Sequence, residues 1–126
     1  MQDLRQGQVY WYDFGPSNGS APAERHPCVV VQNDTFNQTR ISTTVVCLIT
    51  SNLSRARAPG NVLLGKGEAN LPKACAVNIS QLMTVDKSEL VEEIGTLSIQ
   101  RLKEINQGLT LLLEVSRPLD LFSPSK

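Results

Sequence analysis

The chain has 126 residues, a length that predicts one domain with a core of its own. Its 40% hydrophobic and 19% charged content argues against disorder. Twelve basic and twelve acidic residues cancel, which excludes a histone-like nucleic-acid binder but still allows a local basic patch. The longest apolar runs, 28–31 and 45–49, are too short to span a bilayer, and the N-terminus shows no signal-peptide core. We therefore expect a cytoplasmic protein without a membrane partner.

Strand patterns alternate with loops in the first part of the chain. Residues 8–14 (QVYWYDF) are aromatic and β-branched, which predicts a strand, and a loop rich in Gly and Pro follows as far as Pro27. The short apolar runs at 28–32 and 43–49 predict two buried strands. Residues 33–40 between them are polar and turn-like.

Shorter strand patterns follow a second polar loop at 50–60. Residues 61–64 and 74–79 predict short strands, and 81–86 predicts one more. The segment 90–94 fits either a strand or a helix.

An amphipathic helix is predicted over 98–115, because apolar residues recur there at three- and four-residue steps and Ser98 can cap it. Gly108 inside this helix is tolerable if the helix packs closely on a neighbour. The elements together predict a mainly β fold, a small β-barrel with a C-terminal helix. We expect a single domain over 1–116 and a flexible tail over 117–126.

Cysteine spacing and motif content exclude several chemistries. Cys28, Cys47 and Cys75 lie far apart among apolar neighbours, which favours small buried side chains over a metal or redox site. The motifs G-x-x-x-x-G-K-S/T, G-x-G-x-x-G, H-E-x-x-H and G-x-S-x-G are all absent from the sequence. The single histidine makes a zinc site implausible.

Charge is distributed unevenly along the chain. Residues 51–75 contain four basic side chains against Glu68 alone, whereas the last third is acidic. This basic stretch is either a solvated loop or a groove that contacts phosphates.

His26 is the candidate catalytic residue, because histidine alone ordinarily titrates between pH 5 and 8. A lone histidine is by default a surface or packing residue. Its place at a loop end, beside Arg25 and before a buried strand, favours a functional role.

Several strings follow one another in a distinctive order. They are QVYWYDFGPSNGS, RHPCVVVQNDTFN, VVCLITSN, ARAPGNVLL and GEANLPKACAVNISQLMTVDK, and IGTLS follows before the helix. Their order closely resembles the MazF/PemK ribosome-independent endoribonuclease toxins, over residues 5–115. The resemblance implies a CcdB/Kid-like barrel related to SH3 barrels, a homodimer, and cleavage of single-stranded RNA. It also implies a cognate MazE-like antitoxin and no metal or organic cofactor.

The resemblance also implies the active-site residues. The family places an Arg directly before the Pro of the second strand, for acid–base and phosphate chemistry. Here His26 takes that position, and Arg25 stands one residue earlier. The family's Thr at the end of the next strand is matched by Thr50, with Ser51 beside it.

Further polar and basic residues are predicted to contact RNA: Ser20, Asn33, Asn52, Arg55, Arg57, Lys73, Asn78 and Gln81. The acid and amide of the family's G-S-E-Q loop are missing, because Ala21 and Pro22 follow Ser20. The acid–base set of the plasmid-borne branch cannot be carried over either, because Asn78 and Ser80 stand where that branch has Arg and Asp.

Metal-free RNA cleavage needs a base for the 2′-OH, an acid for the departing 5′-oxygen, and donors for the charged phosphate. His26 fits either proton-transfer role. Arg25 can bind phosphate, and Thr50 and Ser51 can donate hydrogen bonds to it. In the alternative interpretation, Arg25 has taken over the family Arg's role and His26 merely packs. Two other functions stay open: a CcdB-like gyrase-poisoning toxin, and an inactive homologue kept for antitoxin binding.

Overall fold

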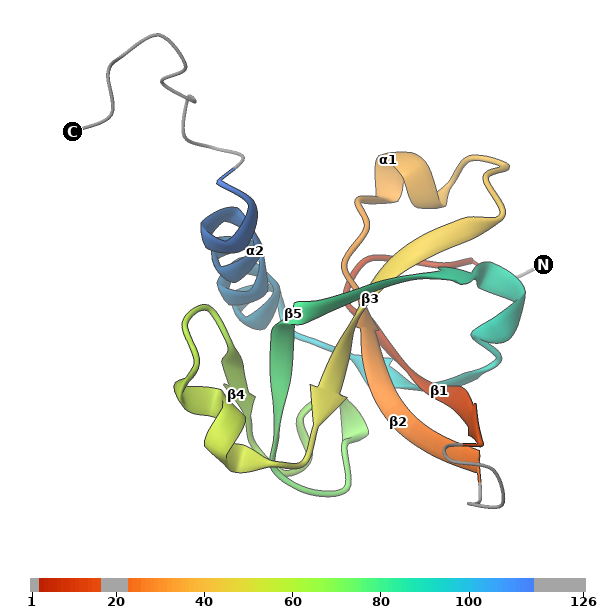
Figure 1. Cartoon of the computed structure of the whole chain (residues 1–126). Helices are drawn as coiled ribbons and strands as arrows, with labels where there is room; N and C mark the ends of the chain where they lie inside the picture. The colour runs from red at the N-terminus through yellow and green to blue at the C-terminus, as the bar shows by residue number, and fades with distance from the viewer. Residues whose placement is uncertain (1–2, 17–22, 115–126) are drawn as a thin grey trace, which may run out of the picture.

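Six antiparallel strands form one sheet in the computed structural model, which describes residues 3–16 and 23–114. The sheet has the order β4-β5-β3-β2-β1-β6 (Figure 1). Its strands are β1 (Gln8–Pro16), β2 (Ala23–Val30), β3 (Thr43–Thr50), β4 (Val62–Leu64), β5 (Cys75–Asp86) and β6 (Glu92–Thr96). The helices are α1 (Asp34–Asn37) and α2 (Ile99–Leu113), and the 3₁₀ turns are η1 (Leu53–Arg57), η2 (Glu68–Asn70) and η3 (Lys87–Glu89).

The sheet curls into a half-barrel with α2 beside it, which confirms the predicted mainly β fold with a C-terminal helix (Figure 1). The turn η2 follows the edge strand β4 and reaches the other edge strand, β6. There the Asn70 side-chain amide donates to the Ile94 carbonyl at 2.9 Å. No helix in 3–16 and 23–114 is long and apolar enough to cross a membrane. The tail predicted at 117–126 lies outside the described residues.

Strand β5 corrects the prediction of two separate strands at 74–79 and 81–86. It runs unbroken from Cys75 to Asp86, but its pairing with β3 shifts between Asn78 and Leu82, which oppose neighbouring β3 residues. The extra residues form a bulge that bends the strand. The strand pattern in the sequence is interrupted where the strand bends.

The segment before Pro27 and the segment after Gln32 also differ from expectation. Strand β2 begins at Ala23, so Pro27 lies inside a strand, opposite Trp11 of β1. Pairing of β2 with β3 starts at Cys28, so Pro27 sits where a missing N–H leaves that ladder intact. The predicted polar turn at 33–40 contains the single-turn helix α1.

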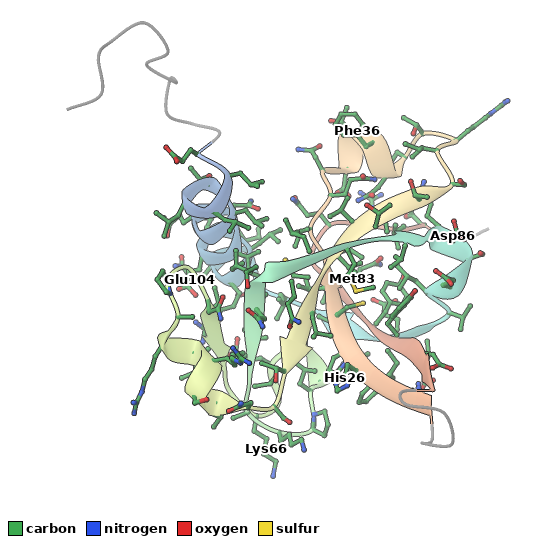
Figure 2. All side chains as sticks on the ribbon, viewed as in Figure 1. His26, Phe36, Lys66, Met83, Asp86 and Glu104 are labelled. Carbon is green, nitrogen blue, oxygen red and sulfur yellow. The ribbon has the colours of Figure 1, made fainter. Side chains whose placement is uncertain are left out.

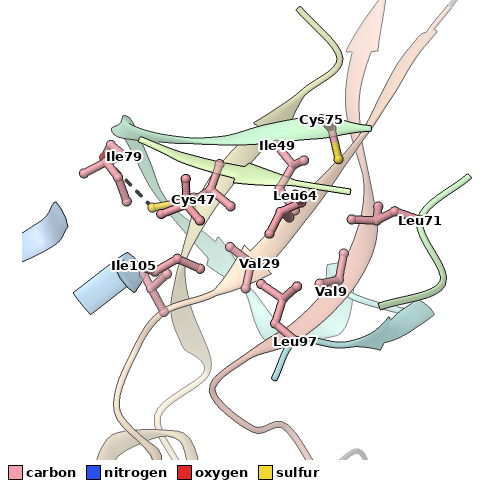
Figure 3. Close-up of a cluster of buried hydrophobic side chains, with 13 residues drawn as sticks. Val9, Val29, Cys47, Ile49, Leu64, Leu71, Cys75, Ile79, Leu97 and Ile105 are labelled. Carbon is pink, nitrogen blue, oxygen red and sulfur yellow. Dashed lines mark hydrogen bonds between the residues drawn. The ribbon is translucent and has the colours of Figure 1, made fainter. Parts of the chain in front are cut away.

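Buried side chains cover both faces of the curled sheet. The larger cluster packs strands β1 to β5 against Leu97 and Ile105 at α2 (Figure 3). The smaller cluster, on the other face, includes Tyr10, Cys28 and Val46. All three cysteines are buried, as predicted, and burial raises the pKa of the Cys28 and Cys47 thiols to about 12.

Helix α2 begins after Ser98, whose hydroxyl accepts a hydrogen bond from the Arg101 N–H at 3.2 Å, as the predicted cap requires. The helix ends at Leu113, two residues earlier than predicted. Gly108 packs directly on the backbone of Gly60: a methyl group built on Gly108 would lie 2.3 Å from the Gly60 carbonyl oxygen. The close packing that the sequence requires of Gly108 is therefore present.

An ion-pair clamp also holds α2 to the rest of the domain. The Arg101 guanidinium donates to both carboxylate oxygens of Glu68, at 2.9 and 2.8 Å, and to Glu104 at 2.9 Å. Hydrogen bonds from Arg101 and from the Gly65 N–H lower the pKa of Glu68. Because Arg101 engages Glu68, the one acidic residue of 51–75 no longer offsets the basic side chains of that stretch.

Candidate active site

The predicted catalytic residues divide between the two faces of the sheet. Strand β2 pairs with β1 so that His26 lies opposite Tyr12 and Pro27 lies opposite Trp11. Successive side chains of a strand point to opposite faces. Arg25 therefore shares the face of Trp11 and Pro27, whereas His26 shares the face of Tyr12.

His26 and Thr50 lie on one face at the end of the β2–β3 pair. The register pairs Cys28 with Leu48, and continuing it by two residues places His26 opposite Thr50. Thr50 is half-buried, and its hydroxyl accepts a hydrogen bond from the Asn52 N–H at 3.1 Å. The hydroxyl proton of Thr50 can point elsewhere, so this side chain is able to donate to a bound oxygen.

Tyr12 borders His26 from the neighbouring strand β1. Its hydroxyl donates to a Glu89 carboxylate oxygen at 3.2 Å. Burial, reinforced by the Glu89 charge and hydrogen bond, raises the pKa of Tyr12. Tyr12 is therefore a neutral phenol at physiological pH, fixed next to the candidate base.

A pocket of about 250 Å³ opens near the same end of the sheet, and His26 borders it as well. Figure 2 shows His26 near the end of the molecule opposite Phe36 of α1. The apolar lining of the pocket includes Ile49, Leu71 and Cys75, and its polar and aromatic lining is Trp11, Arg25, His26, Ser51 and Lys73. The structure thus brings Arg25 and Ser51 together with the basic Lys73.

Arg25 is held in place by two partners at this pocket. Its guanidinium lies 5.2 Å from the centre of the Trp11 ring, within the range of a cation–π interaction. One guanidinium nitrogen also forms an ion pair with Glu92 of β6. The Arg25 and Glu92 side chains are 49% and 60% exposed, so solvent weakens this pair and an anionic ligand can exchange for Glu92.

Asn78 and Gln81, both predicted to contact RNA, meet at the β5 bulge. The Asn78 amide donates to Gln81 at 2.7 Å, and the Asn61 amide donates to Asn78 at 3.3 Å. Asn61 in turn accepts from the Ile79 N–H at 2.8 Å. This amide network stabilises the bulge, and Gln81 remains exposed.

The other predicted RNA-binding residues are more widely spread. Asn33 caps α1 at the far end of the sheet, where its side chain accepts from the Thr35 N–H at 2.7 Å. Asn52 caps η1, which carries the exposed Arg55 and Arg57. Ser20 lies outside the described residues.

Trp11 and Glu92 are site residues that sequence reasoning missed. Trp11 looked like one more apolar strand residue, although its position opposite Pro27 follows once β1 and β2 are paired. Glu92 lies in the segment that fitted either a strand or a helix, so its contact with Arg25 had no sequence signal. No cluster of three or more metal-ligating side chains occurs in 3–16 and 23–114.

A half-barrel with a terminal helix, and a pocket lined by His26, Arg25, Ser51 and Lys73, define a domain suited to bind phosphates. The chain matches the family described as PemK-like, MazF-like toxin of type II toxin-antitoxin system over residues 5–113. It belongs to this family.

Relatives and solved structures match nearly the whole chain. The chain is 35% identical to endoribonuclease MazF2 of Mycobacterium bovis, over 89% of this chain and 98% of that protein. It is 34% identical to endoribonuclease MazF of Staphylococcus saprophyticus, over 87% and 91%. A mycobacterial endoribonuclease in complex with its cognate antitoxin has the same fold, with a TM-score of 0.72, 25% identity and coverage of 91% and 99%. A MazE–MazF crystal structure from Deinococcus radiodurans gives a TM-score of 0.73 at 21% identity, with coverage of 91% and 99%.

Proposed function

We propose that the chain is a sequence-specific endoribonuclease toxin of the cytoplasm that cleaves single-stranded mRNA without a metal ion and so inhibits translation and growth. The observation that carries the proposal is one pocket lined by His26, Arg25, Ser51 and Lys73, in a member of the MazF-like family. The curated relatives are named endoribonucleases.

The reaction is attack of a ribose 2′-oxygen on the adjacent phosphorus. A base removes the 2′-OH proton, the 2′-oxygen–phosphorus bond forms, and the bond to the 5′-oxygen breaks as that oxygen receives a proton. His26 performs one of these two transfers. Because the chain has one histidine, the other transfer falls to another residue type or to a second subunit. Thr50 donates to the developing negative charge on the phosphate.

Incubation with a long single-stranded RNA in EDTA tests this function. We expect discrete fragments that end in 2′,3′-cyclic phosphate and 5′-hydroxyl groups. A duplex of the same sequence serves as the control, and we expect it to stay intact because A-form geometry hides base edges in the major groove. A requirement for magnesium or the appearance of 5′-phosphate ends would exclude 2′-OH attack. Gyrase-dependent DNA breaks would favour a CcdB-like toxin, and intact RNA would favour an inactive homologue.

We also propose a MazE-like antitoxin as a partner. The mycobacterial structural neighbour is solved with its cognate antitoxin. The basic side chains of 51–75 favour an acidic, partly disordered antitoxin tail laid across them, which blocks the RNA site. In the EDTA assay, the complex is then expected to cleave RNA far more slowly than the free toxin.

A homodimer is proposed from the apolar end of α2. Leu111, Leu112 and Leu113 are 62%, 45% and 54% exposed in the single chain. Consecutive exposed leucines are typical of a surface that a partner covers. Sedimentation should show a dimer at micromolar concentration, and Leu112→Glu should shift it at least tenfold toward monomer. Asn106→Glu, the same charge change on an exposed helix position, should leave the dimer intact. A monomeric wild-type protein would contradict the proposal.

A further inference from the structure

We propose that the pocket formed by Trp11, Arg25, Ser51 and Lys73 is a second phosphate subsite. It binds an RNA phosphodiester that flanks the scissile one, and Glu92 competes with this phosphate for Arg25. We call it the flanking-phosphate pocket. The inference rests on the proposed RNA-cleaving function and adds where the strand is held outside the reacting bond.

The chemistry of the pocket suits one anionic group. Arg25 and Lys73 supply two positive charges, and Ser51 supplies a hydroxyl donor. Charge-assisted hydrogen bonds from arginine and lysine are the usual ligands of phosphate. The volume of about 250 Å³ is below the range of drug-sized sites, which leaves room for a phosphate and its sugar rather than for several bases.

The pocket adjoins the site of the reacting phosphate, because His26 lines it whereas Thr50 does not. Thr50 is the last residue of β3, and Ser51 follows it outside the strand and lines the pocket with Arg25. An RNA strand whose scissile phosphate reaches His26 and Thr50 would place a neighbouring phosphate in this pocket. The pocket therefore belongs to a neighbouring phosphate of the same strand.

Glu92 occupies Arg25 before RNA arrives. The Trp11 ring stabilises the guanidinium by a cation–π contact, while Glu92 neutralises its charge. A phosphate offers the same bidentate acceptor as a carboxylate and has Lys73 and Ser51 as further ligands. RNA phosphate therefore displaces Glu92, and loss of the Glu92 charge favours binding.

The chain offers a matched control for Glu92. In the pairing of β6 with β1, Glu92 lies opposite Trp11 whereas Glu93 lies opposite Tyr10. The two acids are neighbours in sequence but belong to opposite faces. Glu93→Gln removes the same charge as Glu92→Gln without touching the Arg25 pair.

The test uses Trp11, the one tryptophan of the 126 residues, as a reporter inside the pocket. The probe is a short RNA that carries the cleavage sequence mapped in the EDTA assay and 2′-O-methyl groups that prevent cleavage. Its binding is followed by Trp11 fluorescence and, separately, by anisotropy of a labelled copy. We expect a saturable change in Trp11 fluorescence with the same Kd as the anisotropy signal.

Variants then assign the contacts. Lys73→Met should raise the Kd about tenfold, whereas Lys103→Met on the exposed surface of α2 should change it less than twofold. Glu92→Gln should lower the Kd about threefold, and Glu93→Gln should not. Replacing one flanking phosphate of the probe by a neutral methylphosphonate should weaken wild-type binding about tenfold yet leave Lys73→Met unaffected.

Binding by anisotropy without a change in Trp11 fluorescence would overturn the proposal. Equal effects of Lys73→Met and Lys103→Met would overturn it too, as would a methylphosphonate penalty that persists at every position in Lys73→Met. Each of these results leaves RNA cleavage in EDTA intact. Failure of the proposed function is distinct, because the EDTA assay then yields no fragments, while binding of a 2′-O-methylated single-stranded RNA of any sequence can still be measured by Trp11 fluorescence.

Discussion

Replacing His26 with Gln should lower the cleavage rate about 10²–10⁴-fold while the KM for RNA stays nearly unchanged. This range is the usual contribution of general acid–base catalysis. His26 is the residue proposed for proton transfer, and the two positive charges of the flanking-phosphate pocket come from Arg25 and Lys73, so RNA binding should survive the loss of His26. The measurement is kcat and KM on a short RNA that carries the cleavage sequence.

The pH profile separates proton transfer from packing. If His26 transfers the proton, the pH dependence of the wild-type rate should require this histidine, the one histidine of the chain. His26→Arg, which restores the residue common in the family, should keep some activity and lose this pH dependence. Thr50→Ala should lower kcat and keep the pH dependence, because Thr50 supplies a hydrogen bond rather than the transferred proton.

The variant Arg25→Met distinguishes a binding role of Arg25 from a catalytic one. If Arg25 only holds the flanking phosphate, this variant raises KM and keeps the pH dependence of kcat. If Arg25 has instead taken the catalytic role, Arg25→Met abolishes cleavage and His26→Gln changes kcat less than threefold. The second pattern would refute the assignment of His26.

Gly108→Ala should lower the free energy of unfolding by about 1–3 kcal/mol, the usual range for overpacking a close contact. In an exposed helix the same change stabilises by about 1 kcal/mol, because alanine is the better helix former. Here the added methyl group would lie 2.3 Å from the Gly60 carbonyl oxygen and 3.0 Å from Ile79 Cγ1. Gly60 cannot move easily, because its φ of 79° requires the left-handed region. The measurement is chemical denaturation.

A matched substitution on the solvent side of the same helix checks that the close contact with Gly60 causes the loss of stability. Asn106→Ala changes an exposed residue two positions earlier and should be neutral or slightly stabilising. A stabilising Gly108→Ala would show that α2 does not pack on Gly60 as described.

Local sequence patterns were sufficient to predict the strands and the helix whose burial is regular along their whole length. The apolar runs around Cys28 and Cys47 became β2 and β3, because a strand buried on both faces needs apolar side chains at every position. The three- and four-residue spacing predicted α2, and the glycine at 108 predicted a close neighbour for it.

Local sequence patterns did not predict the features that depend on pairing between distant strands. Trp11, Arg25 and Glu92 come from three strands, and only the registers of β1 with β2 and β6 bring them together. The division of Arg25 from His26 has the same origin, since neighbours in sequence are separated by the alternation of a strand. The resemblance to a family aligned these residues but carried no information about faces.

Two of the cysteines can report local opening of the domain, one on each face of the sheet. Cys28 belongs to the smaller core cluster and Cys47 to the larger one, although their strands are neighbours. Burial raises the pKa of both thiols to about 12, so access of the reagent governs how fast each thiol is modified. Departure of α2 uncovers the layer that contains Cys47 and leaves Cys28 protected. The labelling order of the two thiols thus records which side of the half-barrel opens first.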